Sequence, residues 1–402
     1  MIQTNNPNKC CGCLVCSVVC PQKCIERVED SCGFVMSKVD ASRCINCGAC
    51  ERVCPIQKNY PKPAFTGQSA YAAYSKDAAL RKRASSGGMF ETVAQFILAK
   101  GGSVFACKLD EDLQLRMHEA TTIDQARELT KSKYIQSRCH DMFPVVKERV
   151  QEGKPVLVCA TPCQIAALQN YLGTLAQAPN VYLMDFFCHG VPSQRFFDKC
   201  REYVQNKHHT KWLSYGFRFK PSHGTTLHYT RYIEQTLQGE QKERTHFYFE
   251  DPFYLGFTQY ITLRDSCYQC PFGSGNHTAD ITVGDLHDAE TSWPQENLYK
   301  GLSKVVINTS KGQELWQVVQ GSLCTKPLSV GKLFPGPTHM PVKRPAFMTD
   351  LQTLPFEIFV GKWLNPRKQW KKAIYYRLPD FVRHGIKKVC LVGRNFYKRS
   401  KK

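Results

Sequence analysis

Two runs near the N-terminus repeat one cysteine pattern: Cys10-Cys-Gly-Cys-Leu-Val-Cys-Ser-Val-Val-Cys-Pro21 and Cys44-Ile-Asn-Cys-Gly-Ala-Cys-Glu-Arg-Val-Cys-Pro55. In each run, pairs of residues separate three of the cysteines, three residues precede a fourth, and a proline follows it. This spacing holds a 4Fe-4S cluster, because two intervening residues let a tight loop turn successive thiolates inward around a cube. The duplication predicts an N-terminal ferredoxin-like module with two clusters.

In two-cluster modules the fourth cysteine of each run ligates the cluster of the other run. The first cluster is therefore expected to take Cys10, Cys13, Cys16 and Cys54, and the second Cys20, Cys44, Cys47 and Cys50. Gly12 and Gly48 ease the turns of the loops. Zinc is the alternative, but its paired knuckles usually lie well apart and lack a fourth cysteine followed by proline. We interpret the other cysteines of this segment, Cys11, Cys24 and Cys32, as buried fillers.

Composition places the chain in a reducing compartment. It has 402 residues, enough for roughly two or three domains, and 21 cysteines. A chain of this size that opens with a polar stretch and no apolar signal segment is not typical of a secreted disulfide protein. No run reaches the ~20 apolar residues that a membrane helix requires. We therefore expect a cytoplasmic protein that is not integral to a membrane.

The formal charge is +20, and the last forty residues are crowded with Lys and Arg interleaved with aromatic and aliphatic residues. A basic amphipathic tail of this kind is typical of a segment that lies on an anionic membrane surface or binds an acidic protein. The alternative is a solvated helix packed on the body of the protein. No nucleic-acid partner is expected, because no recognised reading motif accompanies the charge.

The chain is expected to divide into the cluster module at 1–57, a larger domain at 64–325 and a basic extension at 326–402, with a linker at 59–63. Within the large domain, strand and helix patterns alternate, which indicates an α/β fold with a mixed sheet covered by helices. Helices are expected at 90–99, 123–129, 143–150, from 161 and from 193; strands at 103–108, 113–119, 156–159, 181–187, 216–220, 227–233, 246–250, 281–283 and 304–308.

A second set of cysteines lies in loops of the large domain. Cys163 and Cys188 each follow an expected strand, and Cys267-Tyr-Gln-Cys270 is followed by proline. Four thiols on loop ends can converge on a third 4Fe-4S cluster or, alternatively, on zinc. A lone Cys-x-x-Cys is also typical of a redox disulfide, and Cys163 and Cys188 fit a plain buried role equally well.

Two helices are expected to begin next to segments rich in small or hydroxylated residues. One follows Ser85-Ser86-Gly87-Gly88 and the other follows Thr161-Pro162. Free amide groups at such helix starts favour a phosphate or pyrophosphate, which would suit a dinucleotide such as FAD. The alternative is an ordinary capped helix, and the sequence has no G-x-G-x-x-G fingerprint.

The large domain resembles the beta subunits of coenzyme F420-reducing hydrogenase and F420-dependent dehydrogenases, here fused to a ferredoxin module. The resemblance covers the cysteine runs and most of 71–310, and 7-hydroxymethyl chlorophyll a reductase is similar to the same family. It is carried by the segments Arg83–Gly88, Ser132–Ser137, Val158–Gln164, Phe186–Ser193, Arg264–Pro271 and Ala279–Asp285.

The resemblance implies an FAD in the large domain and a cluster held by Cys163, Cys188, Cys267 and Cys270. The residues it places against the flavin or its phosphates are Ser85, Ser86, Gly87, Gly88, Lys133, Tyr134 and Gln136; the helix start adds Thr161. Two departures from the family pattern, His277 and Leu286-His287-Asp288, put use of a deazaflavin in doubt. His287 is a candidate proton donor, although a lone histidine is more often an ordinary surface residue.

Together these features predict an FAD- and iron–sulfur-dependent oxidoreductase. It would pass electrons between its 4Fe-4S clusters and FAD to reduce or oxidise a small organic substrate. An acidic carrier such as ferredoxin, or a redox partner subunit, would exchange electrons with the clusters. Bacterial relatives often occur beside polysaccharide-assembly enzymes, so a glycan-related substrate and docking at the inner membrane face are part of this hypothesis. The alternative is an electron-transfer subunit of a larger redox complex with no substrate of its own.

Overall fold

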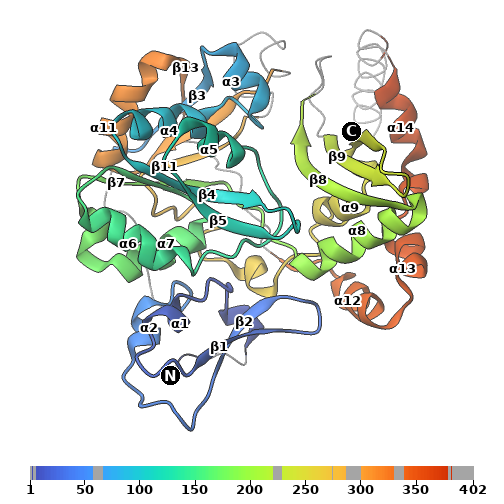
Figure 1. Cartoon of the computed structure of the whole chain (residues 1–402), viewed down its shortest axis with the longest axis horizontal. Coiled ribbons are helices and arrows are strands. Elements are labelled where there is room, and N and C mark those ends of the chain that lie inside the picture. The colour runs from blue at the N-terminus through green and yellow to red at the C-terminus, as the bar shows by residue number, and fades with distance from the viewer. Residues whose placement is uncertain are drawn as a thin grey trace, which may run out of the picture.

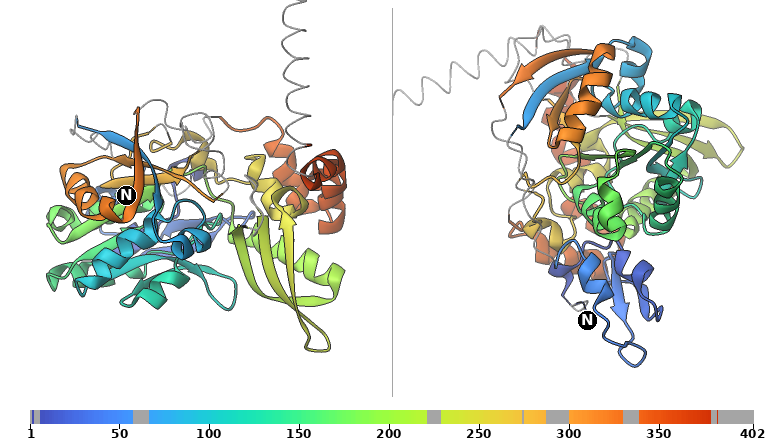
Figure 2. Two further views of the ribbon diagram at one scale, coloured as in Figure 1. Left: turned by 90° about the horizontal axis from the view of Figure 1, so that it is seen from above. Right: turned by 90° about the vertical axis from the view of Figure 1, so that its left-hand side faces the viewer.

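A computed structural model describes residues 2, 6–57, 67–220, 229–273, 275–286, 300–329, 339–378 and 382. Figure 1 shows three parts: a small N-terminal module below, a lobe built on a large sheet above it, and a second lobe at the side. The right-hand view in Figure 2 shows the same module projecting from one end of the molecule. The α/β fold class with an N-terminal ferredoxin-like module is confirmed.

The N-terminal module is an internal duplication around one antiparallel hairpin. The short turn η1 (Pro7–Lys9) precedes helix α1 (Val15–Val19), strands β1 (Ile25–Glu29) and β2 (Val35–Val39) pair, and α2 (Ala49–Val53) follows. The backbone repeats as well: Gly12 and Asn46 have φ of 68° and 54°, and Leu14 and Gly48 have 57° and 71°. A leucine in the left-handed region is uncommon, so the loop geometry rather than residue preference fixes this turn.

An eight-stranded mixed sheet forms the first lobe of the large domain. Its strand order is β13-β3-β12-β11-β7-β6-β4-β5, and β11, β7, β6 and β4 run parallel. The strands are β3 (Ser69–Ser75), β4 (Ser103–Leu109), β5 (Leu115–Ala120), β6 (Val156–Cys159), β7 (Val181–Phe186), β11 (Ile281–Asp285), β12 (Ser303–Ile307) and β13 (Leu323–Leu328).

Helices cover both faces of this sheet, as its buried apolar strands require. On one face α6 (Met142–Gln151) and α7 (Pro162–Leu172) pack with Phe105 and Val158. On the other, α4 (Met89–Ala99), α5 (Ile123–Glu128) and α11 (Ser310–Val319) pack with Val104 and Leu157. The remaining elements of this lobe are α3 (Ala78–Arg83), η2 (Gly173–Gln177) and η5 (Gln320–Ser322).

The second lobe packs a three-stranded antiparallel sheet against helices. Its strands, in the order β10-β9-β8, are β8 (Thr210–Phe219), β9 (Tyr229–Thr236) and β10 (Gln241–Phe247). Its helices are α8 (Gln194–His208), α9 (Pro252–Thr258), α12 (Arg344–Thr353), α13 (Phe356–Trp363) and α14 (Trp370–Arg377), with the turns η3 (Tyr248–Glu250), η4 (Asp265–Gln269) and η6 (Pro366–Gln369). Aromatic side chains fill its core, including Phe197, Phe217, Phe253 and Phe347.

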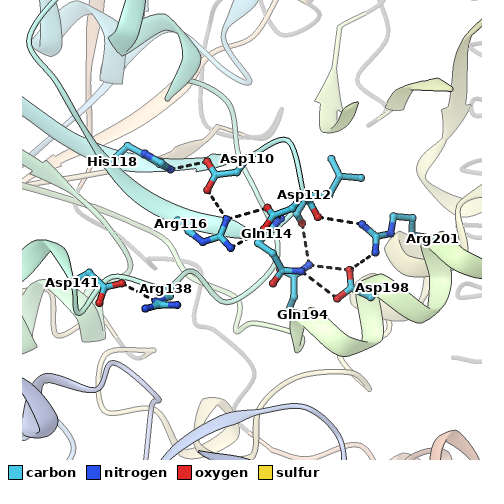
Figure 3. A network of polar contacts seen from close by, with 11 residues as sticks. Asp110, Asp112, Gln114, Arg116, His118, Arg138, Asp141, Gln194, Asp198 and Arg201 are labelled. Atoms are coloured by element: carbon cyan, nitrogen blue, oxygen red, sulfur yellow. Dashed lines mark hydrogen bonds and ion pairs between the residues drawn. The ribbon is translucent and has the colours of Figure 1, made fainter. Parts of the chain in front are cut away.

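A polar network ties the edge of the large sheet to the second lobe (Figure 3). The turn between β4 and β5 lies against α8: Gln194 donates to the carbonyl of Leu113 at 3.0 Å, and Arg201 donates to the carbonyl of Asp112 at 3.3 Å. Arg116 on β5 pairs with Asp112 at 2.7 Å and orders the turn. These contacts hold the two lobes in one arrangement.

Most of the predicted strands and helices of the first lobe occur within a few residues of their expected positions. The predicted strand at 246–250 is right only for its first two residues: β10 ends at Phe247, and Tyr248–Glu250 forms a 3-10 helix. Glu250 stabilises this turn, because its carboxylate accepts from the backbone N–H of Phe247 at 3.1 Å. The predicted strand at 216–220 is only the end of β8.

The basic C-terminal extension begins inside the core rather than outside it. β13 belongs to the large sheet up to Leu328, and Phe347, Phe359 and Leu364 are buried with the aromatic core of the second lobe. The division at 1–57, 64–325 and 326–402 stays a prediction. The tail beyond Leu378, apart from Val382, lies outside the described residues. In the described part of the chain, no helix is both long and apolar enough to cross a bilayer.

We expect Phe347→Ala to lower the free energy of unfolding by about 3–5 kcal/mol, because it empties a fully buried aromatic site. Phe347 has no exposed surface, and its ring centroid lies 4.9 Å from that of Phe359. Denaturant unfolding measures the change. Ile358→Ala, on the neighbouring helix but 58% exposed, is the control and should cost less than about 0.5 kcal/mol. Equal losses would show that α12 is not part of the core.

Candidate functional site

The cysteines predicted for the second N-terminal cluster line one pocket. Cys20 from the first run lies there with Cys44, Cys47 and Cys50 from the second, which is the set expected if the fourth ligand comes from the other run. Ala49 opens α2 shortly after Cys47, and Gly48 with φ 71° forms its N-cap. Cys24 also lies on this wall, with its Sγ 3.4 Å from that of Cys20, although sequence reasoning gave it no role. The donor set fits a 4Fe-4S cluster.

The cysteines predicted for the first cluster form a second group. Cys16 lies near Cys10 and Cys54, and burial raises the pKa of the Cys16 thiol to about 12. Burial also raises the pKa of Cys54. Cys13 is buried beside Cys16 and packs toward the large domain with α7. Bare thiols in such an apolar setting stay protonated, whereas coordination to iron deprotonates them.

The third set of cysteines converges as the resemblance implies. β6 and β7 are parallel neighbours, so the loops after their carboxyl ends meet at one edge of the sheet. One of these loops places Cys163 in the first turn of α7, and the other carries Cys188. Cys267 and Cys270 come from η4 and its C-cap, and all four line a single pocket. The chain therefore assembles a four-thiol site from three segments far apart in sequence.

Close backbone approach is needed where these loops meet. Gly190 has φ 94°, and a Cβ built there would lie 2.8 Å from Leu263 Cδ1 and 3.1 Å from Cys267 Cβ. Burial raises the pKa of Cys188, and it raises those of Cys267 and Cys270 to about 12. The adjacent Cys11 thiol, together with burial, raises the pKa of Cys163. Four such buried thiols suit a metal cluster, whose charge would stabilise the thiolates.

The N-terminal module inserts into this pocket. Cys11 lines it and contacts Cys163. Its carbonyl accepts from Gln136 Nε2 at 2.9 Å, and the carbonyl of Cys10 accepts from Arg264 Nη1 at 3.2 Å and from Ser266 Oγ at 3.0 Å. Sequence reasoning treated Cys11 as a filler and gave Arg264 no role, because nothing in the local pattern shows which loops meet.

The residues predicted to hold the flavin fall into two separate groups. Gln136 and Thr161 line the cysteine pocket, with Thr161 Oγ1 3.3 Å from the Sγ of Cys163. Ser85 and Tyr134 lie together elsewhere, joined by Arg218, which donates to the carbonyl of Ser85 at 3.1 Å and to the hydroxyl of Tyr134 at 3.2 Å. That these residues contact one flavin stays a prediction.

The Ser85–Gly88 loop is held by the sheet rather than open to solvent. Ser86 Oγ donates to the carbonyl of Leu302 at 2.8 Å, and the amide of Gly87 donates to Ser303 Oγ at 2.9 Å. Gly88, with φ 95°, is the N-cap of α4. Lys220 Nζ bridges the carbonyls of Ser86 at 2.6 Å and Arg81 at 2.7 Å, beside this loop.

Lys133 lies on the inner side of the same region. Its ammonium donates to the carbonyls of Leu129 and Thr130, both at 2.7 Å. Burial lowers the pKa of Lys133 to about 8. The structure therefore gives this lysine a role in closing the end of α5, and a direct flavin contact stays a prediction.

Of the two histidines that depart from the family pattern, one is described. His277 is buried, and its Nδ1 lies 2.8 Å from Asp185 Oδ2, while Thr282 donates to the other oxygen of Asp185 at 2.5 Å. This network joins β7 to β11 beneath the cysteine loops. His287, the candidate proton donor, lies outside the described residues.

Comparison with protein families places the chain in a redox class. Residues 153–330 match the family that comprises the C-terminal part of the beta subunit of coenzyme F420 hydrogenase/dehydrogenase, and residues 37–57 match the 4Fe-4S binding domain. The protein is thus an iron–sulfur redox protein. The match over residues 153–330 confirms the resemblance to the beta subunits of coenzyme F420 hydrogenase/dehydrogenase.

A solved structure of the F420-reducing [NiFe] hydrogenase complex from Methanosarcina barkeri contains a chain that is similar to this one. The identity is 19%, the match covers 73% of this chain and 91% of that chain, and the TM-score is 0.43. Among curated proteins, no sequence matches this chain.

We expect Cys47→Ser to lower the iron content by about one to four irons per chain, because Cys47 is one of four thiols around the second pocket and its loss leaves one iron of a 4Fe-4S cluster without its thiolate. Iron and sulfide determination on anaerobically purified protein measures the loss. Cys324→Ser on β13, far along the sheet from any of the pockets, is the control and should leave the iron content unchanged. Unchanged iron in both variants would contradict the ligand assignment.

Proposed function

We propose that the chain is an iron–sulfur flavoprotein oxidoreductase. It takes single electrons from an acidic carrier such as ferredoxin, or from a redox partner subunit, and delivers them to a small organic substrate through FAD. The observation that carries this proposal is the convergence of Cys163, Cys188, Cys267 and Cys270 on one pocket against which the ferredoxin module is docked. A third 4Fe-4S cluster there would continue the path from the module into the large domain.

The order of the three sites supports a relay. Cys47 of the second N-terminal site is exposed, so electrons can be accepted there from outside. Cys16 of the first site has Cys50 of the second as a neighbour. Cys11, next to the first-site ligand Cys10, reaches the third pocket. Short steps between buried sites are what electron transfer over this length of protein needs.

The exposed end of the relay suits a negatively charged carrier. Around Cys47, Ile45 is 59% exposed, and Arg43 and Arg52 are exposed as well. Arg52 Nη1 donates to the carbonyl of Cys47 at 3.0 Å. An apolar contact flanked by arginines, on a chain of formal charge +20, favours association with an acidic surface.

For the flavin, the Ser85 and Tyr134 group offers the better chemistry. The ring of Tyr134 lies 4.7 Å from that of Phe257 and 5.3 Å from that of Tyr254, and Arg218 and Lys220 supply cations beside the helix start of α4. Aromatic rings, cations and a helix N-terminus are suited to a ring system bearing phosphates. We therefore assign FAD to this group and the third cluster to the group with Gln136 and Thr161.

A flavin would connect the clusters to the substrate, because a cluster carries one electron at a time whereas organic substrates are reduced by pairs of electrons. Two electrons taken singly, with one proton from solvent, would leave together as a hydride to the substrate; His287 is the candidate donor of a further proton. A glycan-related substrate and contact of the basic C-terminus with the cytoplasmic face of the membrane belong to this proposal.

The second candidate is an electron-transfer subunit with no substrate of its own. The exposed Cys47 region and the match to a hydrogenase subunit over residues 153–330 favour it equally. The purified chain, loaded with FAD and supplied with dithionite, should reduce an unsaturated carbonyl compound faster than dithionite and free FAD do without the protein if it is the enzyme. Turnover that requires an added partner polypeptide would favour the subunit.

We expect the purified chain to hold about twelve irons and one FAD, and Cys188→Ser to hold about eight irons, because the variant loses only the third cluster. Iron, sulfide and flavin determination on one anaerobic sample measures both. Cys200→Ser, buried within α8 and away from the cysteine pockets, is the control. Eight irons in the unaltered chain would contradict the third cluster, and twelve without flavin would favour the electron-transfer subunit.

We expect Lys220→Met to weaken FAD binding at least tenfold, because it removes the cation that bridges the Ser86 and Arg81 carbonyls. Fluorescence titration of the flavin-free chain with FAD measures the affinity. Lys76→Met is the matched control: Lys76 also donates to a backbone carbonyl, that of Gly321 at 2.7 Å, but it lies at an exposed position away from Tyr134. Equal affinities for the two variants would place the flavin elsewhere.

A further inference from the structure

Arg264 is a buried cation that pairs with no carboxylate in the part of the chain that the structure describes. Arg264 is only 2% exposed. No carboxylate lies within ion-pair distance of its guanidinium among the residues that the structure describes. Its Nη groups donate to neutral acceptors only: the carbonyls of Cys10 at 3.2 Å and Val35 at 2.7 Å, and the side-chain oxygen of Gln136. Its guanidinium carbon lies 5.2 Å from the ring centre of Phe34.

Such an arrangement is costly unless a negative charge faces it. Removing a charged group from water into a protein interior costs several kcal/mol when no opposite charge is near. The Nε of Arg264 is buried and has no hydrogen-bond partner among the described residues. The same residue lines the pocket of Cys163, Cys188, Cys267 and Cys270. The missing counter-charge is therefore best supplied from inside that pocket.

We propose that Arg264 is the counter-cation of the cluster held by these four cysteines and sets its reduction potential, an inference that rests on the third cluster of the proposed function. Four thiolates give such a cluster a net negative charge, and reduction adds one electron to it. A fixed cation stabilises the reduced form more than the oxidised form and raises the potential. Arg264 is a positioning residue here, because it need not touch the substrate.

The hydrogen bonds of Arg264 also make this charge depend on the docked module. Two of its three acceptors, Cys10 and Val35, belong to the N-terminal module, and the third, Gln136, donates in turn to the carbonyls of Cys11 and Gly12 at 2.9 and 3.1 Å. A Cβ at Gly12 would lie 2.3 Å from Gln136 Nε2. The module thus holds the guanidinium beside the pocket, which couples docking of the electron source to the potential of the acceptor.

The test is an anaerobic redox titration followed by electron paramagnetic resonance, on the full chain and on Arg264→Gln and Arg264→Lys. The signal of the third cluster is identified as the one that Cys188→Ser lacks. We expect Arg264→Gln to disfavour reduction of this cluster at least tenfold, which is about 59 mV for a one-electron couple. Arg264→Lys keeps the positive charge, so its equilibrium constant for reduction of the third cluster should stay within threefold of that of the unaltered chain.

Arg195→Gln is the matched control. Arg195 also crosses to the N-terminal module, donating to the carbonyl of Ser31 at 3.2 Å and pairing with Glu29 at 3.1 Å, but its side chain is 44% exposed. The Arg195→Gln variant also removes one positive charge from this interface. Because water screens that charge, the equilibrium constant for reduction of the third cluster should change less than twofold. A shift in Arg195→Gln as large as in Arg264→Gln would overturn the proposal.

Iron analysis separates the remaining outcomes. About eight irons in the unaltered chain would remove the third cluster itself and the proposal with it. If Arg264→Gln keeps about twelve irons and its equilibrium constant for reduction of the third cluster stays within twofold of that of the unaltered chain, the role of Arg264 is overturned. The cluster itself would then stand. If Arg264→Gln loses the cluster, retention of it in Arg264→Lys supports the counter-cation, and loss in both overturns it.

Discussion

The structure depends on one geometric constraint: thiolates that ligate a cubane cluster must converge from separate turns of the chain. In the N-terminal module, Cys20 of the first run lies in the pocket lined by Cys44, Cys47 and Cys50 of the second, so a cluster there would bind the two halves to each other. The apolar contacts there are few, with Ile2, Ile25 and Val39 packed against the cysteines themselves. Binding of the clusters would then also stabilise the fold of this module.

The large domain also brings four thiols together from separate segments of the chain. Parallel pairing of β6 with β7 brings the loops that carry Cys163 and Cys188 to one edge of the sheet, and the segment before β11 returns to that edge with Cys267 and Cys270. The module docks on this edge through α1 and α2, which pack on the α6 and α7 face, and through Phe34, which packs into the second lobe. One surface of the module thus touches both lobes, and the pocket of thiols lies at their junction.

The cysteine pocket and the region of Ser85 and Tyr134 differ in how their cations are paired. Arg264 faces thiols with no carboxylate of its own in the described residues, whereas Arg218 pairs with Asp285 at 2.6 Å. A cation that is already paired binds further anions weakly, so the helix start of α4 would contribute more than Arg218 to holding phosphates. An uncompensated cation, in contrast, acts on whatever charge develops beside it.

Local spacing in the chain was enough to predict the features that depend on neighbouring residues. The cysteine runs, the crossing of Cys20 to the second pocket, the left-handed turns at Gly12 and Gly48 and most strands and helices of the first lobe follow from patterns a few residues long. Which segments meet was settled only by how whole elements pack. Cys11 and Arg264 became part of the third site because the module docks there, Gln136 and Thr161 separated from Ser85 and Tyr134, and the start of the basic extension entered the core. Contacts between residues a hundred or more positions apart depend on packing and desolvation of whole elements, and no short-range pattern encodes them.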